Sequence, residues 1–232
     1  MLLISSSISF GVTNTSDYGM KKTKRGVPRA ITAEGVHTKV LPLLSSETKG
    51  RILDLGAGPG ALSYKLKELG FEVTAVDISR DFVVEGVNFV IADLNKGIPF
   101  KSGSFDSVCA VEILEHLENP RFLIEEINRV LRHRGKCIIT TPNLEQIYSR
   151  IYFLVSGRFL YFTPPDVEKA GHTTPIFLWN FDRFIKGLFL KEITTFNNAA
   201  PIPILRRKIK IRFPFLNKLT GEIWIMKLVK AS

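Results

Sequence analysis

The sequence has little cysteine and no long apolar run. Its 232 residues include two cysteines, Cys109 and Cys137, and both lie inside apolar stretches that we expect to be strands. Isolated cysteines in such stretches are usually buried thiols, so the pattern argues against a disulfide framework or a cysteine metal site and fits a reducing, cytoplasmic setting. No apolar run reaches the roughly 18 residues that a membrane-spanning helix needs, and we therefore expect no transmembrane segment.

The start of the chain lacks the features of a secretory signal. Met1–Phe10 is apolar and serine-rich, but it has neither a basic leading segment nor a convincing cleavage site. We expect a basic N-terminal arm over residues 1–30 and one domain over residues 31–232. Two interpretations of the arm stay open: residues 1–19 lie upstream of a translation start at Met20, or the arm is disordered.

The formal net charge of +10 is concentrated in two stretches, Lys21–Arg29 and Arg206–Arg212. Such surfaces favour anionic partners, either RNA or a membrane surface. Basic side chains at a strand edge also prevent edge-to-edge pairing, and the sequence leaves both interpretations open.

Apolar stretches alternate with helical patterns along most of the chain. The expected helices cover residues 32–46, 61–69, 79–85 and 120–132, and the expected strands cover residues 51–55, 72–76, 88–92, 106–111 and 136–141. Residues 96–103 are rich in turn-forming residues. Repeated strand-helix units predict an α/β fold with a doubly wound, mostly parallel sheet.

A glycine-rich turn follows the first expected strand. Gly56, Gly58 and Gly60 alternate after the apolar run that contains Asp54, and a helical stretch follows. The spacing is G-x-G-x-G, which differs from the G-x-G-x-x-G of dinucleotide folds. Because a carboxylate lies two residues before the turn and Pro59 removes one amide, the turn suits a cationic ligand better than a pyrophosphate.

Acids follow the next two strands at the same edge of the sheet. Asp77 lies about 20 residues beyond Gly56, where a ribose diol is usually bound, and Asp93 closes the third strand. Any one of these acids could be a simple cap or turn former. Together with the glycine turn, they predict a nucleoside site at the carboxyl edge.

These motifs resemble those of the class I S-adenosylmethionine-dependent methyltransferases, in particular the small-molecule O-methyltransferase branch. The matching segments are residues 53–60, 76–79, 91–94, 105–108 and 131–136. In the last of these the family usually has Pro-Gly-Gly, whereas this chain has His133-Arg134-Gly135. The resemblance implies a Rossmann-like sheet of seven strands, with a sixth strand near 191–197 and a seventh near 222–229.

The resemblance also implies S-adenosylmethionine as the cofactor. Asp54 would lie near its ammonium group, Asp77 would bind the ribose hydroxyls, and Asp93 would receive the adenine amino group, with Ile78 and Leu94 on the adenine ring. The full set of implied cofactor residues is Asp54, Gly56, Ala57, Gly58, Gly60, Asp77, Ile78, Asp93, Leu94 and Val111.

A Glu-x-x-Glu-His element follows the fourth strand. Glu112, Glu115 and His116 have i, i+3, i+4 spacing, so one helical turn would place them on one face, where they could hold a divalent ion. His172 could be a fourth ligand. The element is similar to that of two methyltransferase branches, which act on catechol-like ubiquinone precursors and on the terminal ribose 2′-hydroxyl of small RNAs. This likeness implies Mg²⁺ or Mn²⁺; in other members, which use no metal, His116 would be the catalytic base or would only brace the loop.

Residues 143–180 combine aromatic residues with prolines and leave the same edge of the sheet. We expect them to form a substrate-side lid, although a helix packed on the core is the alternative. The predicted function is S-adenosylmethionine-dependent O-methylation of a small or amphiphilic, lipid-like hydroxylated acceptor. The alternatives are an RNA ribose 2′-O-methyltransferase, a cofactor-binding protein without turnover and, as the weakest, a nicotinamide oxidoreductase.

Overall fold

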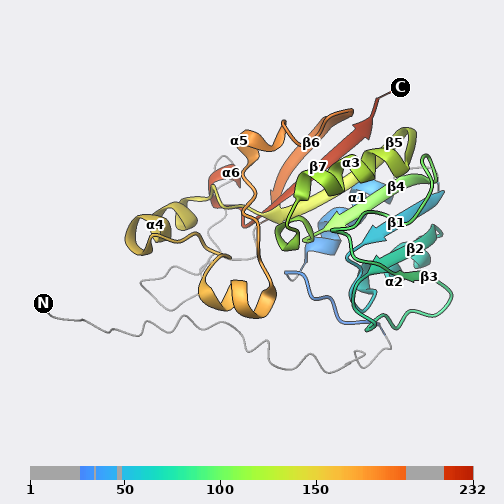
Figure 1. The fold of residues 1–232 in the computed structure, drawn as a ribbon, viewed down its shortest axis with the longest axis horizontal. Helices are drawn as coiled ribbons and strands as arrows, with labels where there is room; N and C mark the ends of the chain where they lie inside the picture. The colour runs from blue at the N-terminus through green and yellow to red at the C-terminus, as the bar shows by residue number, and fades with distance from the viewer. Residues whose placement is uncertain (1–26, 34, 46–48, 197–216, 232) are drawn as a thin grey trace, which may run out of the picture.

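The computed structural model describes residues 27–33, 35–45, 49–196 and 217–231. Within these residues the chain forms a seven-stranded sheet with helices on both faces (Figure 1). The strands are β1 (Arg51–Leu55), β2 (Glu72–Asp77), β3 (Asn88–Ile91), β4 (Phe105–Val111), β5 (Leu131–Pro142), β6 (Leu188–Phe196) and β7 (Ile223–Lys230). The helices are α1 (Val36–Ser45), α2 (Ala61–Glu68), α3 (Pro120–Val130), α4 (Ile147–Ser156), α5 (Leu178–Phe181) and α6 (Asn217–Thr220), with a 3₁₀ turn η1 (Leu114–His116) and a π turn η2 (Asp166–Ala170).

The strand order is β3-β2-β1-β4-β5-β7-β6. The strands β1 to β5 pair in parallel, and β7 runs antiparallel between β5 and β6. The predicted doubly wound, mostly parallel sheet is confirmed, including the two late strands that the resemblance implied.

Two apolar clusters cover the two faces of the sheet. Alternate residues of β1 enter different clusters, because successive side chains of a strand point to opposite faces. Leu53 packs in the cluster that contains Ile124 and Ile127 of α3. Ile52 packs in the cluster that contains Val40 of α1 and Leu66 of α2. The two cysteines are buried and free, as predicted.

One predicted helix, over residues 79–85, is absent, and a loop without helix joins β2 to β3. The Ser79 amide donates to Asp77 at 2.8 Å, and the Ser79 hydroxyl both donates to the Asp81 carboxylate and accepts from the Asp81 amide. Short polar side chains that bind nearby backbone groups compete with helix formation. Phe82 stacks on Phe89 of β3 with ring centroids 4.4 Å apart, which fixes the loop against the sheet.

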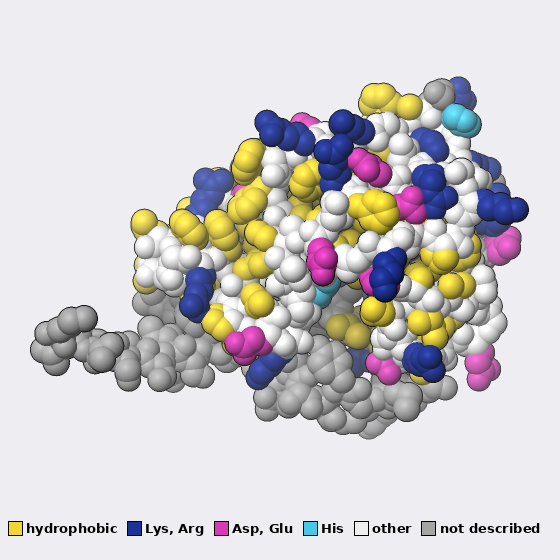
Figure 2. Space-filling view, in the orientation of Figure 1, with side chains coloured by type: hydrophobic (Ala, Val, Ile, Leu, Met, Phe, Trp, Pro, Cys, Tyr) yellow, Lys and Arg dark blue, Asp and Glu magenta, His cyan; other side chains and the backbone are white. Residues whose placement is uncertain are grey.

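Other boundaries differ less. The strand predicted at 136–141 begins earlier, at Leu131, so it contains the His-Arg-Gly segment, where Arg134 has a φ of 59°. The predicted first helix begins at Val36 and contains Pro42. Most of the predicted arm, residues 1–26, and the basic stretch 206–212 lie outside the described residues. Of the helices that the structure describes, none is long and apolar enough to cross a membrane. Lys and Arg side chains are spread widely over the face shown in Figure 2.

Candidate active site

A cavity of about 640 Å³ opens at the carboxyl edge of the parallel strands. Its lining comes from seven parts of the chain: residues 29–33 with His37, the end of β1 with the glycine turn and the start of α2, the end of β2 with the loop after it, the loop from β4 into η1, the end of β5 at Pro142, the segment from Tyr161 to His172, and Glu222 with Ile223 at the start of β7. This volume is typical of small-molecule sites. The fold therefore brings segments that are distant in the sequence to one concave site.

The glycine turn needs glycine for two separate reasons. Gly56, Gly58 and Gly60 have φ values of 71°, 51° and 95°, in the left-handed region that other residues rarely adopt. A Cβ at Gly56 would lie 2.7 Å from Ile113 Cδ1, so a side chain there would collide with the cavity wall. The turn is thus shaped by backbone conformation as well as by close packing.

Asp77 ends β2 and holds the turn in place. Its carboxylate accepts hydrogen bonds from the Gly58 amide at 2.7 Å and from the Ser79 amide at 2.8 Å. Each carboxylate oxygen has two acceptor positions, so both oxygens can still accept a bond from a ligand in the cavity. Asp77 is therefore placed to bind hydroxyl groups, as a ribose diol requires.

Asp54 lines the cavity from β1 and is 2% exposed. Burial raises the pKa of its carboxyl to about 7, and the nearby Asp77 also raises it, while the Ser63 hydroxyl that donates to it at 2.6 Å acts in the opposite direction. A cation in the cavity would favour the ionised form of this carboxyl.

The predicted cofactor residues divide into two groups. Those that line the cavity are Asp54, Gly56, Ala57, Gly58, Asp77, Ile78 and Val111, whereas Gly60, Asp93 and Leu94 do not. Asp93 accepts from the Asn95 amide at 3.0 Å and pairs with Lys96 at 3.5 Å. Leu94 is 5% exposed and packs in the core against α3. Because neither Asp93 nor Leu94 lines the cavity, the structure does not support the predicted adenine contacts of these two residues.

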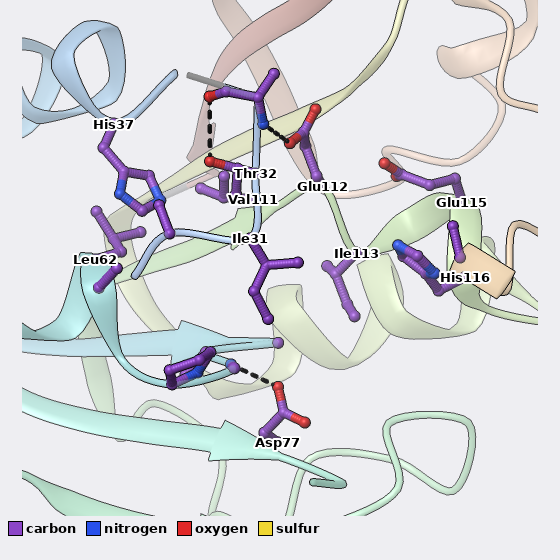
Figure 3. Close-up of a pocket in the computed structure, with 18 of the residues that line it drawn as sticks. Ile31, Thr32, His37, Leu62, Asp77, Val111, Glu112, Ile113, Glu115 and His116 are labelled. Carbon is purple, nitrogen blue, oxygen red and sulfur yellow. Dashed lines mark hydrogen bonds between the residues drawn. The ribbon is translucent and has the colours of Figure 1, made fainter. Parts of the chain in front are cut away.

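The prediction that Glu112, Glu115 and His116 share one helical face is wrong. Glu112 has a φ of 49°, and the 3₁₀ turn begins only at Leu114. The Glu112 carboxylate accepts a hydrogen bond from the Ala33 amide at 3.0 Å, and burial raises its pKa to about 7 (Figure 3). Glu112 therefore fastens the segment before α1 across the cavity.

Glu115, His116 and His172 do come together. One possible ligand atom from each lies within 4.8 Å of the others, and the two imidazole rings meet edge to face with centroids 4.8 Å apart. Glu115 is 1% exposed, and burial, followed by the charge of Glu112, raises its pKa to about 8. Burial lowers the pKa of His116, and the nearby His172 lowers it further. This cluster contains three of the four predicted metal ligands.

The backbone orients His172 toward the cluster. His172 Nδ1 lies 2.5 Å from the carbonyl oxygen of Tyr161, which can only accept, so Nδ1–H donates to it. The amides of Thr173 and Thr174 donate to the carbonyl of Glu115 at 2.7 and 3.0 Å. The segment that carries His172 is thus anchored directly on the loop that carries Glu115.

Of the predicted lid, residues 143–180, only Tyr161, Ala170 and His172 line the cavity. Sequence reasoning missed other residues of the cavity wall, among them Arg29, Ile31, Thr32, Ala33, His37, Ile113, Tyr161 and Glu222. His37 is 5% exposed, its Nδ1 has no hydrogen-bond partner among the described residues, and burial lowers its pKa to about 4. No local pattern distinguishes these residues, because they reach the cavity through long-range packing.

The sequence is similar to known methyltransferases over part of its length. Residues 53–139 match the family described as methyltransferase domain. The ubiquinone biosynthesis O-methyltransferase of Xanthomonas oryzae is 33% identical over 103 residues, covering 40% of this chain and 43% of that protein. The mitochondrial ubiquinone biosynthesis O-methyltransferase of Dictyostelium discoideum is 24% identical over 168 residues, covering 64% of this chain and 49% of that protein. The chain thus matches about half the length of these curated relatives.

A solved structure shows the same fold. The S-adenosylmethionine-dependent methyltransferase from Archaeoglobus fulgidus has a TM-score of 0.59 at 20% identity, covering 84% of this chain and 93% of that one. The matched domain contains the glycine turn, Asp77 and the Glu115-His116 element, all of which lie at one cavity. Residues 53–139, which match the methyltransferase-domain family, form the part of the sheet from β1 to β5, and the fold of the chain is that of solved S-adenosylmethionine-dependent methyltransferases.

Proposed function

We propose that the protein is an S-adenosylmethionine-dependent methyltransferase that modifies a hydroxyl oxygen of a small or amphiphilic acceptor. The observation that carries the proposal is a single cavity with Asp77 and the glycine turn on one side and Glu115, His116 and His172 on the other. The similarity to O-methyltransferases of ubiquinone biosynthesis supports a hydroxyl acceptor.

The cofactor side fits a cationic nucleoside. Asp77 would hold the ribose hydroxyls, the glycine turn would lie against the methionine part, and the carboxyl of Asp54 would face the positive groups. Bound there, S-adenosylmethionine supplies an electrophilic methyl group on a sulfonium. Carboxylates in a partly buried cavity attract such a cation more strongly than exposed ones do.

On the acceptor side, His116 is the candidate base. Its lowered pKa keeps the imidazole neutral near pH 7, so it can accept the proton of an acceptor hydroxyl. Such assistance typically contributes about 10²–10⁴-fold to a rate. Holding the hydroxyl in line with the methyl group supplies much of the remaining acceleration.

A metal ion is the alternative use of the same cluster. One carboxylate and two imidazoles suit Mn²⁺ better than Mg²⁺, which prefers oxygen ligands. An ion held by Glu115, His116 and His172 would lower the pKa of the acceptor hydroxyl, and His116 would then be a ligand rather than a base. Titration of the protein with Mn²⁺, followed by electron paramagnetic resonance, distinguishes the two roles, because binding that His172→Ala abolishes supports the metal site.

The cavity is less suited to the RNA alternative. Its lining includes the acids Asp81, Glu112 and Glu222, whereas Arg29 is the one Lys or Arg among the described lining residues. Phosphate groups would meet mainly negative charge there.

The buried free thiols Cys109 and Cys137 are consistent with our inference of a cytoplasmic location.

The direct test is transfer of an isotopically labelled methyl group to a panel of acceptors. The panel contains catechols with and without a long alkyl chain, simple alcohols, amines and short RNAs. We expect label on a catechol-type hydroxyl. Label on RNA ribose would support the alternative, and cofactor binding without any product across the panel would favour a protein without turnover.

A further inference from the structure

The helix α4 carries an exposed apolar surface that the cavity does not use. This helix extends away from the body of the sheet in Figure 1. The side chains of Leu154 and Val155 are 84% and 82% exposed, and those of Ile151 and Phe153 are 51% and 45% exposed. We call residues 151–155 the apolar tip. Large hydrophobic side chains that are gathered in this way, rather than scattered singly, indicate an interaction site.

A row of aromatic rings extends the apolar tip toward α5. Phe153 stacks on Phe159 with centroids 4.5 Å apart, Phe159 meets Phe177 at 5.2 Å, and Phe177 lies 6.3 Å from Trp179. Trp179 at the end of the row is 73% exposed. Figure 2 shows hydrophobic side chains gathered over α4 and the adjoining part of the molecule. The apolar surface is therefore continuous between two elements.

The charged side chains within residues 146–165 have one sign, although the acids Glu145 and Asp166 flank this stretch and Glu145 accepts a hydrogen bond from the Trp179 amide at 3.2 Å. From Gln146 to Pro165 the sequence contains two arginines, Arg150 and Arg158, and no aspartate or glutamate. Both arginines are exposed. A protein partner with an apolar groove would not require this charge pattern. An anionic lipid surface would, because arginines contact lipid phosphates while apolar side chains enter the boundary of the acyl chains.

We propose that α4 docks the protein on an anionic lipid bilayer, with Leu154 and Val155 inserted among the headgroups and Trp179 at the interface. Exposed tryptophan is typical of such interfaces because its ring is apolar and its N–H is polar. No residue of α4 lines the cavity, so this is a separate site. The chain then continues from α4 to Tyr161 and His172, which do line the cavity, so docking would place the acceptor side close to the membrane.

The test is flotation of the full-length protein with vesicles, without cofactor or acceptor. One set of vesicles contains phosphatidylglycerol and phosphatidylcholine in equal amounts, and the other contains phosphatidylcholine alone. We expect binding to the first set, and we expect Leu154→Glu/Val155→Glu to reduce the bound fraction at least about tenfold. The neutral variant Leu154→Ser/Val155→Ser should also lose binding, because the apolar contact is removed without added charge.

The matched control is Ile91→Glu/Leu69→Glu. These two side chains are 50% and 37% exposed and lie near the opposite edge of the sheet, by β3 and α2, and the change in net charge is the same. We expect this variant to bind vesicles like the unchanged protein. Binding should also shift the tryptophan emission to shorter wavelength, and Trp179→Phe should remove the shift because the other tryptophan, Trp224, is 3% exposed.

Three outcomes would overturn the proposal. Equal binding to both vesicle sets would remove the role of anionic lipid. Unchanged binding of Leu154→Glu/Val155→Glu would assign binding to other basic stretches, such as residues 206–212. A dimer in light scattering that this variant converts to a monomer, without vesicle binding by either protein, would assign the surface to a second copy of the chain.

Discussion

The two sides of the cavity are built from different kinds of contact. On the proposed cofactor side, the Asp77 carboxylate holds the glycine turn through the amide of Gly58, 19 residues earlier in the chain, and also binds the Ser79 amide two residues later. On the acceptor side, Glu115 and His172 meet only because the segment after α4 returns to the η1 loop. The cofactor side is thus specified locally, whereas the acceptor side depends on where a long excursion of the chain comes back.

This difference has a functional consequence. A site held by nearby backbone groups can keep its geometry when residues elsewhere in the chain are substituted, since few distant residues are needed to form it. A site assembled from separate segments can vary in acceptor with small changes in the returning segment. We therefore expect substitutions on the two sides to separate cofactor affinity from turnover.

The largest effect is expected from His116→Ala. In the proposed mechanism His116 acts on the acceptor hydroxyl as a base or as a metal ligand, so kcat should fall about 10²–10³-fold while the cofactor Kd changes little. Steady-state kinetics with the accepted substrate and calorimetry with the cofactor measure the two quantities. The exposed His133 provides the matched control, because His133→Ala should leave both values unchanged. A kcat for His116→Ala equal to that of the control would exclude His116 from the chemistry.

The next effect is expected from Asp77→Ala, which removes two hydrogen bonds to backbone amides and the candidate ribose contact. We expect the cofactor Kd to rise about 100-fold, from the loss of charge-assisted hydrogen bonds. Asp93→Ala tests whether the cofactor site extends to Asp93, which does not line the cavity. The cofactor Kd of Asp93→Ala should change much less. A rise in this Kd equal to that of Asp77→Ala would place Asp93 in the cofactor site.

Cofactor binding should also depend on pH. Burial raises the pKa of Asp54 to about 7 in the free protein, and the positive cofactor would lower it in the complex, so binding releases a proton. Affinity should therefore rise with pH, by about tenfold between pH 6 and 8. Calorimetry across this range measures it, and Asp54→Asn should flatten the profile. Adenosine, which is uncharged, should show little change, and an equally steep profile for adenosine would contradict this explanation.

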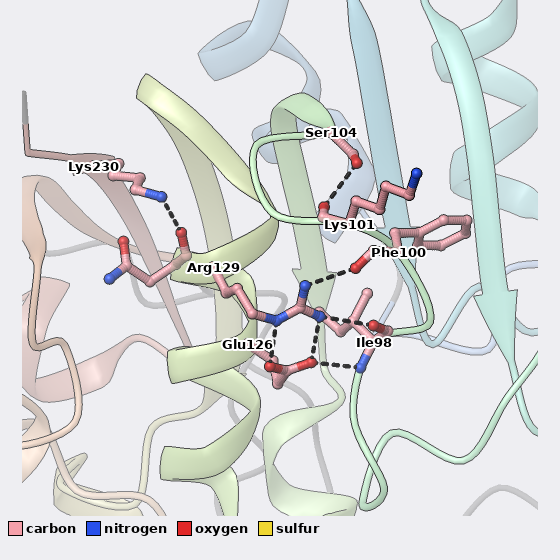
Figure 4. Close-up of polar contacts among 8 residues, drawn as sticks. Ile98, Phe100, Lys101, Ser104, Glu126, Arg129 and Lys230 are labelled. Carbon is pink, nitrogen blue, oxygen red and sulfur yellow. Dashed lines mark hydrogen bonds and ion pairs between the residues drawn. The ribbon is translucent and has the colours of Figure 1, made fainter.

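The smallest effect on function is expected away from the cavity, at Arg129 on α3 (Figure 4). Its guanidinium pairs with Glu126 at 2.6 Å and donates to the carbonyls of Ile98 and Phe100 at 2.8 and 2.7 Å. The pairing with Glu126 raises the pKa of Arg129, which therefore stays charged. The cluster fixes residues 96–103 on α3.

Arg129→Met should lower the free energy of unfolding by about 1–3 kcal/mol, because two carbonyls and a carboxylate lose their donor. Urea denaturation measures this change, while kcat and the cofactor Kd should stay the same. In Arg121→Met the lost partner is Glu125, and both side chains are about half exposed. We expect less than about 0.5 kcal/mol there. Equal losses in the two variants would mean that the Arg129 cluster adds nothing beyond a surface ion pair.

Several elements were predicted correctly because their signals are local. The strand at 51–55, the glycine turn after it and the helix that begins at Ala61 follow from apolar runs and from glycine positions. The helix expected over residues 79–85 was wrong, because the Asp77 carboxylate binds the Ser79 amide and the Ser79 hydroxyl binds the Asp81 amide, in competition with helical hydrogen bonds. The helical spacing of apolar residues does not reveal these competing hydrogen bonds.

The spacing of Glu112, Glu115 and His116 was also misleading. It would place the three side chains on one face only if the backbone were helical throughout. The left-handed φ of Glu112 instead turns its carboxylate toward Ala33. Nothing in the local sequence indicates that residues 29–33 lie across this cavity, because their position depends on how α1 packs.

Local patterns in the sequence are sufficient to predict most strands and helices of the sheet and the glycine turn at its carboxyl edge, because hydrophobic periodicity and glycine act over a few residues. Three features follow from the folded chain and not from local patterns: His172 joins Glu115 and His116, Glu112 does not, and α4 exposes Leu154 and Val155. These arrangements depend on contacts between segments that are far apart in the chain. Tertiary packing, and not local propensity, brings such segments together.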